Sequence, residues 1–291
     1  MRFITFSKEG VATVGVRLRD SIVDLSAAAP RLPGSIVDMV KADLLQEAYD
    51  IAKTAPASAH LDPNSIDWLP VIPRPPLLFG FGINYGSHAG PRPEFPGFFV
   101  STHTRLVAHR EAMVIPKLSA TLDYEVELAI VMKRGGKGIS RRDALDYIAA
   151  YTIFNDGSVR GYGGGETLAL MKNSDRTAPF GPEIVTPDEL PSGAAGLRLR
   201  TRRNGVEVQN DTTNQMYWKV PEIIETVSQY VTLGPGDVIT TGTPGGTMVE
   251  TAIKSGLAWS DPSIDWLKDG ETIECEIEGI GVISNPVCAE R

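Results

Sequence analysis

The chain has 291 residues, of which 42% are hydrophobic and 22% are charged, with a formal net charge of −8. These values are ordinary for a globular protein, and the length suffices for a large domain together with a small one. The acidic balance, interrupted only by short basic runs at 141–143 and 198–205, argues against a nucleic acid as the natural partner.

Cysteine usage and hydropathy restrict the class further. The two cysteines, Cys275 and Cys288, are too few for a disulfide framework or a cysteine-rich zinc site. No run approaches the ~18–20 apolar residues of a membrane span, and the first ten residues lack the apolar run of a signal peptide. We therefore expect a cytoplasmic protein without a membrane partner.

The first 70 residues predict a small α+β domain. Short strands are expected at 2–7, 12–18 and 21–25, followed by a helix over 35–55 with Ser35 as its start signal. The run 70–76 contains four prolines and predicts a stiff linker. A larger domain, 71–291, follows.

Strands dominate the pattern of the larger domain. Helices are expected at 140–151 and 220–231, and strands at 77–81, 121–132, 148–154, 183–186, 197–202, 237–241 and 272–284. Many strands with few, scattered helices favour an α+β, mostly β architecture over a regular βαβ series. Gly80, Gly82 and Gly86 approach a dinucleotide-binding fingerprint, but the third glycine falls one place late and prolines follow where a helix should begin.

Two glutamates stand out within the apolar run "TLDYEVELAIVMKR" at 121–134. On a strand of period two, Glu125 and Glu127 point to the same side, and we expect them at the wetter end of a mostly buried strand. Their repulsion at a spacing of ~7 Å and an effective dielectric of ~20 is roughly 2 kcal/mol. A bridging basic side chain, solvation or a divalent cation between them would each make the arrangement tolerable.

A third carboxylate is available in the turn "NDG", residues 155–157, which ends another apolar strand. Asp156 could complete an oxygen site, since Mg²⁺ and Ca²⁺ require about six oxygen ligands, some of them from water. The alternative is that the turn is ordinary chain reversal and that the glutamates form an ion-paired surface. The four histidines lack the spacing of a helical zinc site, so a hard, oxygen-preferring cation is the better hypothesis.

Six segments in this order resemble the fumarylacetoacetate hydrolase family. They are "GINYGSHA" at 82–89, "LDYEVELAIV" at 122–131, "AYTIFNDGSVR" at 150–160, "KNSDRTAPFGPEIVT" at 172–186, "RNGVEVQNDTT" at 203–213 and "LGPGDVITTGTPGG" at 233–246. The resemblance covers residues 77–288. It implies a mixed β roll with a small N-terminal domain, a homodimer, and Mg²⁺ or Mn²⁺ bound by Glu125, Glu127 and Asp156.

The same resemblance implies roles for further residues. His88 takes the place of the family's usual base, and Lys172 is expected beside the metal and the substrate. The remaining residues expected to contact a small 2-keto acid substrate are Arg160, Thr243, Gly242 and Tyr85.

The chain departs from the family pattern after His88. Many members carry a glutamate three residues after the histidine, where this chain has Pro91, and the prolines at 91, 93 and 96 disfavour the helix found there in many members. Glu94 is the only carboxylate within 77–110. We therefore predict that Glu94 replaces the missing partner of His88 if the protein is a hydrolase.

These residues predict a divalent-metal-dependent hydrolase that cleaves a C–C bond in an acylpyruvate or a related β-diketo acid, with a role in aromatic catabolism. The altered partner of the histidine keeps an alternative open, namely a decarboxylase, tautomerase or hydratase of a 2-keto diacid. A metal-binding protein without catalysis is the third hypothesis. The long segment 247–270 is predicted to cover the core or a dimer interface, with substrate covering as the alternative.

Overall fold

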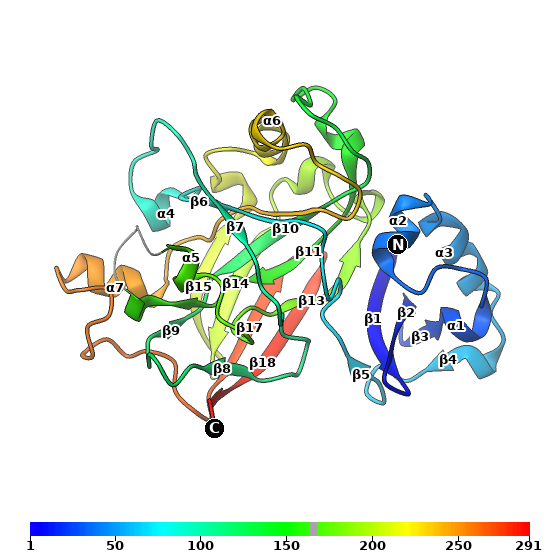
Figure 1. Ribbon diagram of the computed structural model, residues 1–291, viewed down its shortest axis with the longest axis horizontal. Coiled ribbons are helices and arrows are strands. Elements are labelled where there is room, and N and C mark those ends of the chain that lie inside the picture. The colour runs from blue at the N-terminus through cyan, green and yellow to red at the C-terminus, as the bar shows by residue number, and fades with distance from the viewer. Residues whose placement is uncertain (163–167) are drawn as a thin grey trace.

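The computed structural model describes residues 1–162 and 168–291. Two β-sheets form its centre, and short helices lie around them (Figure 1). None of the helices in the described part of the chain has the length and apolar character needed to span a bilayer.

The larger sheet has eleven strands among the described residues. These are β1 (Arg2–Lys8), β2 (Val11–Leu18), β3 (Ser21–Asp24), β4 (His60–Leu61), β5 (Asp67–Trp68), β6 (Leu78–Gly82), β7 (Gly97–Ser101), β10 (Val126–Met132), β11 (Ile148–Asn155), β13 (Phe180–Val185) and β16 (Val238–Thr240). Their order is β4-β3-β2-β1-β13-β11-β10-β16-β6-β7, with β5 paired to β1. Neighbours are antiparallel except β16 and β6, which are parallel.

A second sheet of five strands packs against the middle of the first. Its order is β15-β14-β17-β18-β8, and a separate pair is formed by β9 and β12. The bounds are β8 (Met113–Ile115), β14 (Arg198–Arg203), β15 (Val206–Thr212), β17 (Thr272–Ile277), β18 (Gly281–Ala289), β9 (Leu122–Asp123) and β12 (Ser158–Val159). The mixed β architecture expected from the sequence is confirmed.

The helices are short and lie outside the sheets. They are α1 (Leu25–Ala28), α2 (Ile36–Lys41), α3 (Leu45–Lys53), α4 (Gly86–Ala89), α5 (Leu168–Met171), α6 (Val220–Tyr230) and α7 (Met248–Lys254). The helix predicted over 35–55 is found as two, α2 and α3, because the chain turns at Asp43 with a φ of 55°. Ser35 caps α2 as expected, since its hydroxyl accepts a hydrogen bond from the N–H of Asp38 at 3.1 Å.

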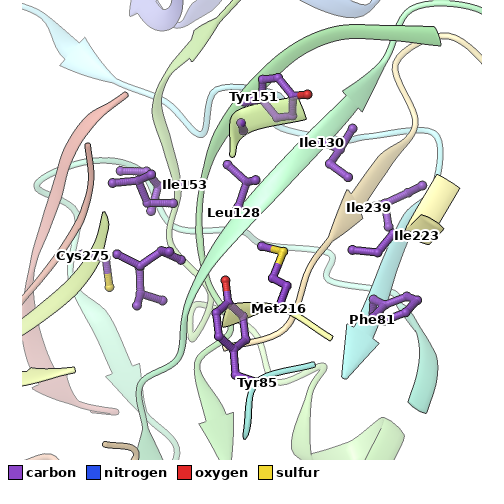
Figure 2. Close-up of a cluster of buried hydrophobic side chains, with 14 of the residues drawn as sticks. Phe81, Tyr85, Leu128, Ile130, Tyr151, Ile153, Met216, Ile223, Ile239 and Cys275 are labelled. Carbon is purple, nitrogen blue, oxygen red and sulfur yellow. The ribbon is translucent and has the colours of Figure 1, made fainter. Parts of the chain in front are cut away.

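The two faces of β10 enter different hydrophobic clusters. Leu128 and Ile130 pack with Cys275 of β17 and Ile223 of α6 (Figure 2). The alternate residues of β10, 129 and 131, join a cluster with the N-terminal strands and helices. This confirms the period of two predicted for the strand. The predicted run 121–132 is nevertheless interrupted between β9 and β10, where the Asn155 side chain accepts the Glu125 N–H at 2.9 Å.

The helix predicted over 140–151 is wrong. Only a 3₁₀ turn, Ala144–Tyr147, forms before β11 begins at Ile148. Every residue of β11 is buried, and the strand pairs with β10 on one side and β13 on the other. These pairings on two sides outweigh the local helical pattern. The single strand predicted at 272–284 is likewise a hairpin of β17 and β18.

The N-terminal segment continues the main sheet. Arg2 and Phe3 of β1 pair with Val185 and Ile184 of β13. The proline-rich run 70–76 is packed rather than free, since Val71 is buried and its N–H donates to the carbonyl of Phe180 at 3.0 Å. The boundary near residue 70 remains a prediction, because no break in the sheet marks it.

Asp24 links β1, β3 and α1, and we expect its removal to destabilise the fold. Its carboxylate caps α1 by accepting the N–H of Ser26 at 2.8 Å and pairs with the ammonium of Lys8 at 2.6 Å. Asp24→Ala should lower the free energy of unfolding by about 1–2 kcal/mol, measured by urea denaturation. Asp20→Ala, at an exposed position in the preceding turn, is the control and should change it little.

The loss of stability in Asp24→Ala should depend on pH. Burial would raise the pKa of Asp24, but the hydrogen bonds from Lys8 and Ser26 outweigh it and lower that pKa below the ordinary value of 3.8. A carboxylate with a lowered pKa stabilises the folded state above its unfolded pKa and loses that contribution as the pH falls through the folded value. The difference between wild type and Asp24→Ala should therefore hold down to pH 4 and shrink below it. A difference that grew on acidification would contradict this role.

Candidate active site

Three buried carboxylates meet where β10 begins and β11 ends. Glu125 precedes β10, Glu127 lies in it, and Asp156 follows β11. The pairing of Val126 with Asn155 brings the two strands into this register, and the N–H of Asp156 donates to the carbonyl of Glu125 at 2.9 Å. One oxygen from each carboxylate lies within 4.8 Å of the others.

The prediction that the glutamates sit at a wet strand end is wrong. The exposed fractions are 4% for Glu125, 3% for Glu127 and 1% for Asp156. A buried carboxylate is tolerated only with compensating charge. Lys172, which follows α5, supplies part of it: its Nζ lies 2.5 Å from Oε2 of Glu125 and 2.7 Å from Oδ2 of Asp156.

Arg160 supplies the second buried cation. Its guanidinium donates to Oδ2 of Asp123 from two nitrogens, at 3.0 and 3.1 Å, and also pairs with Glu125. The predicted contact of Arg160 with substrate is not matched by this placement, because the residue is 4% exposed and its guanidinium is already engaged by two carboxylates. Its role in the structure is to hold Glu125.

The pKa values of the three metal-site carboxyls diverge. Burial would raise the pKa of Glu125, but Lys172 and Arg160 hold it at about 2. The pKa of Glu127 is raised well above its usual range by burial and by the charges of Asp156 and Glu125. Burial also raises the pKa of Asp156, although Lys172 opposes it. Without a further cation, the negative charge is therefore most costly at Glu127.

Charge and hydrogen bonding both fit a divalent cation here. Four buried carboxylates, Asp123 included, face two buried cations, so this cluster of described residues carries two more negative than positive groups, and Glu127 has no basic partner among them. Oδ1 of Asp156 is buried and has no hydrogen-bond partner in that part of the chain. Carboxylate oxygens are the ligands that Mg²⁺ and Mn²⁺ prefer. Glu125, Glu127 and Asp156 thus form a divalent metal site.

His88 of α4 is paired with a carboxylate from the far end of the chain. Its Nδ1 lies 2.7 Å from Oε1 of Glu250, in the first turn of α7. The Gly246 N–H and the Lys254 ammonium also donate to Glu250, at 3.2 and 3.1 Å. Burial would raise the pKa of Glu250, but these donors and His88 lower it, so the carboxyl is ionised. In Figure 1, α4 and α7 lie on the same side of the molecule, away from the N-terminal helices.

Asp123 connects this pair to the metal site. Besides holding Arg160, its carboxylate accepts the N–H groups of Met248 and Val249, at 2.9 and 3.1 Å, at the start of α7. A carboxylate at a helix start satisfies N–H groups that have no partner within the helix. One buried side chain therefore fixes both the helix that carries Glu250 and the arginine that holds a metal ligand.

The Thr-Gly-Thr-Pro loop adjoins the same carboxylates. The N–H of Gly242 donates to Oε2 of Glu127 at 2.9 Å. Gly242 has a φ of 83°, and a Cβ there would lie 2.9 Å from the carbonyl oxygen of Phe81, so only glycine fits. Thr243, which is buried, follows Gly242 directly, and its predicted contact with a substrate carboxylate remains a prediction.

Gly80, the first glycine of the rejected dinucleotide fingerprint, has a packing reason. A Cβ on Gly80 would lie 2.2 Å from the ring of Phe99 on the neighbouring strand β7. The same ring lies 5.6 Å from Nζ of Lys172. Gly80 thus leaves room for the Phe99 ring, which brings an apolar group near the ammonium.

Comparison with known proteins agrees with this geometry. The model of the fumarylacetoacetate (FAA) hydrolase C-terminal family matches residues 78–288, which is more than half of the chain. The chain belongs to the fumarylacetoacetate hydrolase family. It is 35% identical over 300 residues to the mitochondrial oxaloacetate tautomerase fahd2 of Xenopus laevis, covering 99% of this chain and 90% of that protein.

Solved structures of the family have the same fold along the whole chain. The fumarylacetoacetate hydrolase of the psychrophilic Exiguobacterium antarcticum superposes with a TM-score of 0.83 at 28% identity, with 100% of both chains covered. The 5-carboxymethyl-2-hydroxymuconate delta-isomerase of Mycobacterium smegmatis gives a TM-score of 0.76 at 25% identity, also with 100% of both chains covered. The chain is therefore a metal-dependent enzyme of the fumarylacetoacetate hydrolase family.

The structure corrects the predicted partner of the family's histidine. Glu94 is exposed on the loop after α4, whereas Glu250 contacts His88. Glu94 is the only carboxylate within 77–110, whereas Glu250 lies 162 positions after His88. Glu250 lies in the first turn of α7, and an acidic residue near a helix start is too common to indicate a partner for His88. That segment also covers the core as predicted, since Trp266 joins the main hydrophobic cluster.

Tyr85 does not match its predicted contact with substrate. Its ring is fully buried and lies with Phe81, Met216 and Leu128 in the hydrophobic cluster (Figure 2). Burial raises the pKa of its hydroxyl well above the usual range, and the nearby charge of Glu127 adds to this. Among the described residues its role is to pack the loop that leads to His88.

Proposed function

We propose that the chain interconverts the keto and enol tautomers of a 2-keto diacid of the oxaloacetate class, with a divalent cation at Glu125, Glu127 and Asp156. The likeness to oxaloacetate tautomerases over nearly the whole chain supports this substrate class. That likeness carries the choice of reaction, and the His88–Glu250 pair supplies the positioned base that a tautomerase needs.

The chemistry moves one proton. In the keto form the proton is on the carbon next to the keto group, and in the enol form it is on the keto oxygen. Glu250 accepts the hydrogen on Nδ1 of His88, which leaves Nε2 without a proton and free to take one from that carbon. The same imidazole, once charged, is stabilised by the ionised Glu250 and can return the proton.

Charge near the substrate is supplied by several groups. A divalent cation bound by the three carboxylates would stabilise the negative charge that develops on the keto oxygen. Lys172 adds a fixed positive charge beside Glu125 and Asp156. In this proposal the Thr243 hydroxyl, next to Gly242, holds a carboxylate of the substrate. The burial of these side chains keeps water away, and the low local dielectric strengthens each interaction.

Cleavage of a C–C bond in an acylpyruvate is the second candidate. Hydrolysis requires a base that activates water, and the loss of the usual glutamate at Pro91 had argued against it. The His88–Glu250 pair supplies such a base from a different part of the chain, which supports this candidate. The same residues would then act on water instead of on a carbon-bound proton.

Product analysis separates the candidates. Enol oxaloacetate is mixed with the protein and Mg²⁺, the ultraviolet absorbance of the enol is followed, and acylpyruvates are tested in parallel for release of pyruvate. We expect faster loss of the enol with neither CO₂ nor pyruvate as product. Pyruvate from an acylpyruvate without an effect on the enol would replace the tautomerase by the hydrolase, and CO₂ release would indicate a decarboxylase.

A further inference from the structure

Gln209, on β15, is a buried amide with every hydrogen-bonding position used. Its Oε1 accepts the N–H of Val126 at 3.1 Å and the hydroxyl of Thr201 at 2.7 Å. Its Nε2 donates to the carbonyl of Pro244 at 2.8 Å and to the hydroxyl oxygen of Thr243 at 2.9 Å. The side chain is 1% exposed and joins β10 to the Thr-Gly-Thr-Pro loop.

Two backbone groups determine which way this amide points. The N–H of Val126 can only donate, so it requires the amide oxygen, and the carbonyl of Pro244 can only accept, so it requires the amide nitrogen. In the reverse orientation the amide NH₂ would face the N–H of Val126, and the amide oxygen would face the carbonyl of Pro244. Both contacts would be repulsive in a buried site. With the amide in this orientation, Nε2 also donates to the hydroxyl oxygen of Thr243.

The orientation has a consequence for Thr243. Its oxygen already accepts a hydrogen bond from Gln209, and its own hydrogen has no acceptor among the described residues. The preceding residue, Gly242, donates its N–H to the metal-site carboxylate of Glu127. Because the Thr243 oxygen already accepts a hydrogen bond, the hydroxyl next to the metal site is available as a donor. It therefore favours a ligand atom that is a hydrogen-bond acceptor.

We propose that Gln209 is a positioning residue that presents the Thr243 hydroxyl as a hydrogen-bond donor to a substrate carboxylate. The inference rests on the proposed function, in which Thr243 holds a carboxylate. It adds that the polarity of this contact is set by a side chain that touches neither substrate nor metal.

Binding of oxalate, a small dianion with two carboxylates, tests this in the Mn²⁺-loaded protein by calorimetry. Gln209→Met removes the donor, and Thr243→Val removes the hydroxyl. Each should weaken oxalate binding roughly tenfold to a hundredfold, the scale of one hydrogen bond to a charged group. The double variant should be little worse than either single variant, because the two act as one unit.

Controls separate positioning from general damage. The affinity for Mn²⁺ alone should stay within threefold of wild type in both single variants, because Glu125, Glu127 and Asp156 are untouched. Gln215→Met, the same change at an exposed glutamine of the segment after β15, should leave oxalate binding unchanged. If Gln209→Met does not fold, Gln209→Leu, which is also uncharged and removes the same donor, is the second variant, and the same loss is expected.

The outcomes are distinct from those for the proposed reaction. Wild-type oxalate affinity in a folded Gln209 variant would overturn the inference, even if the enzyme is a tautomerase. Weakened oxalate binding with unchanged Mn²⁺ affinity would support it, even if the enol assay points to the hydrolase. An equal loss of Mn²⁺ affinity would show that Gln209 only supports β10, which would also overturn it.

Discussion

Replacing Glu127 by alanine is expected to abolish tight binding of Mg²⁺ and Mn²⁺ and to reduce activity to background. The variant loses one of three protein ligands, and the remaining carboxylates, Glu125 and Asp156, are already paired with Lys172. The fold should survive, because burial and neighbouring charges make Glu127 the most costly negative charge of the group in the absence of a cation. Calorimetry with Mn²⁺ measures the affinity directly.

Thermal unfolding gives a readout independent of activity. Metal at 100 times its Kd stabilises the wild type by about 2.7 kcal/mol, so Tm should rise when metal is added. Glu127→Ala should show no such rise, whereas Glu207→Ala, which removes an exposed carboxylate on β15, should behave as wild type. Unchanged Mn²⁺ affinity in Glu127→Ala would refute the metal site.

Removing either member of the His88–Glu250 pair should lower kcat by roughly 10²-fold or more, the usual scale for a positioned base. His88→Ala removes the base, and Glu250→Gln removes the charge that holds the Nδ1 hydrogen and stabilises the charged imidazole. The double variant should be little worse than either single one, because the pair acts as a unit. Rates are measured at saturating metal, with Mn²⁺ affinity as the check that the metal site is intact.

The exposed carboxylate on the loop after α4 provides the decisive comparison. Glu94→Gln should keep nearly full activity, since the structure pairs His88 with Glu250 instead. An inactive Glu94→Gln together with an active Glu250→Gln would show that the loop closes differently in the working enzyme. That result would make Glu94 the partner of His88, as first predicted from the sequence.

How far the sequence predicts the site can be judged from particular residues. The alternation along 121–132 placed Glu125 and Glu127 on one side of a strand, and the turn after β11 supplied Asp156; the structure brings all three together. These features are local, because strand period and turn chemistry depend on near neighbours in the chain. Their burial was not predictable in this way, since the compensating Lys172 comes from a separate segment.

The family resemblance extended the prediction beyond local patterns, with mixed results. It gave His88 the role of the base and Thr243 a contact with the substrate, and these roles remain predictions. It assigned Arg160 and Tyr85 to the substrate, whereas the structure commits the first to two carboxylates and the second to the hydrophobic core. Motif position does not decide the direction of a side chain, because neighbouring strands and helices occupy the space around it.

The sequence by itself determined the strand-rich class, the order of the motifs and the three metal-binding carboxylates. Only the tertiary structure decided the partner of His88, the link through Asp123 and the polarity imposed by Gln209 on Thr243. These contacts join residues from 34 to 162 positions apart. Such contacts produce no periodic pattern in the sequence, because they depend on which distant segments the two sheets bring together.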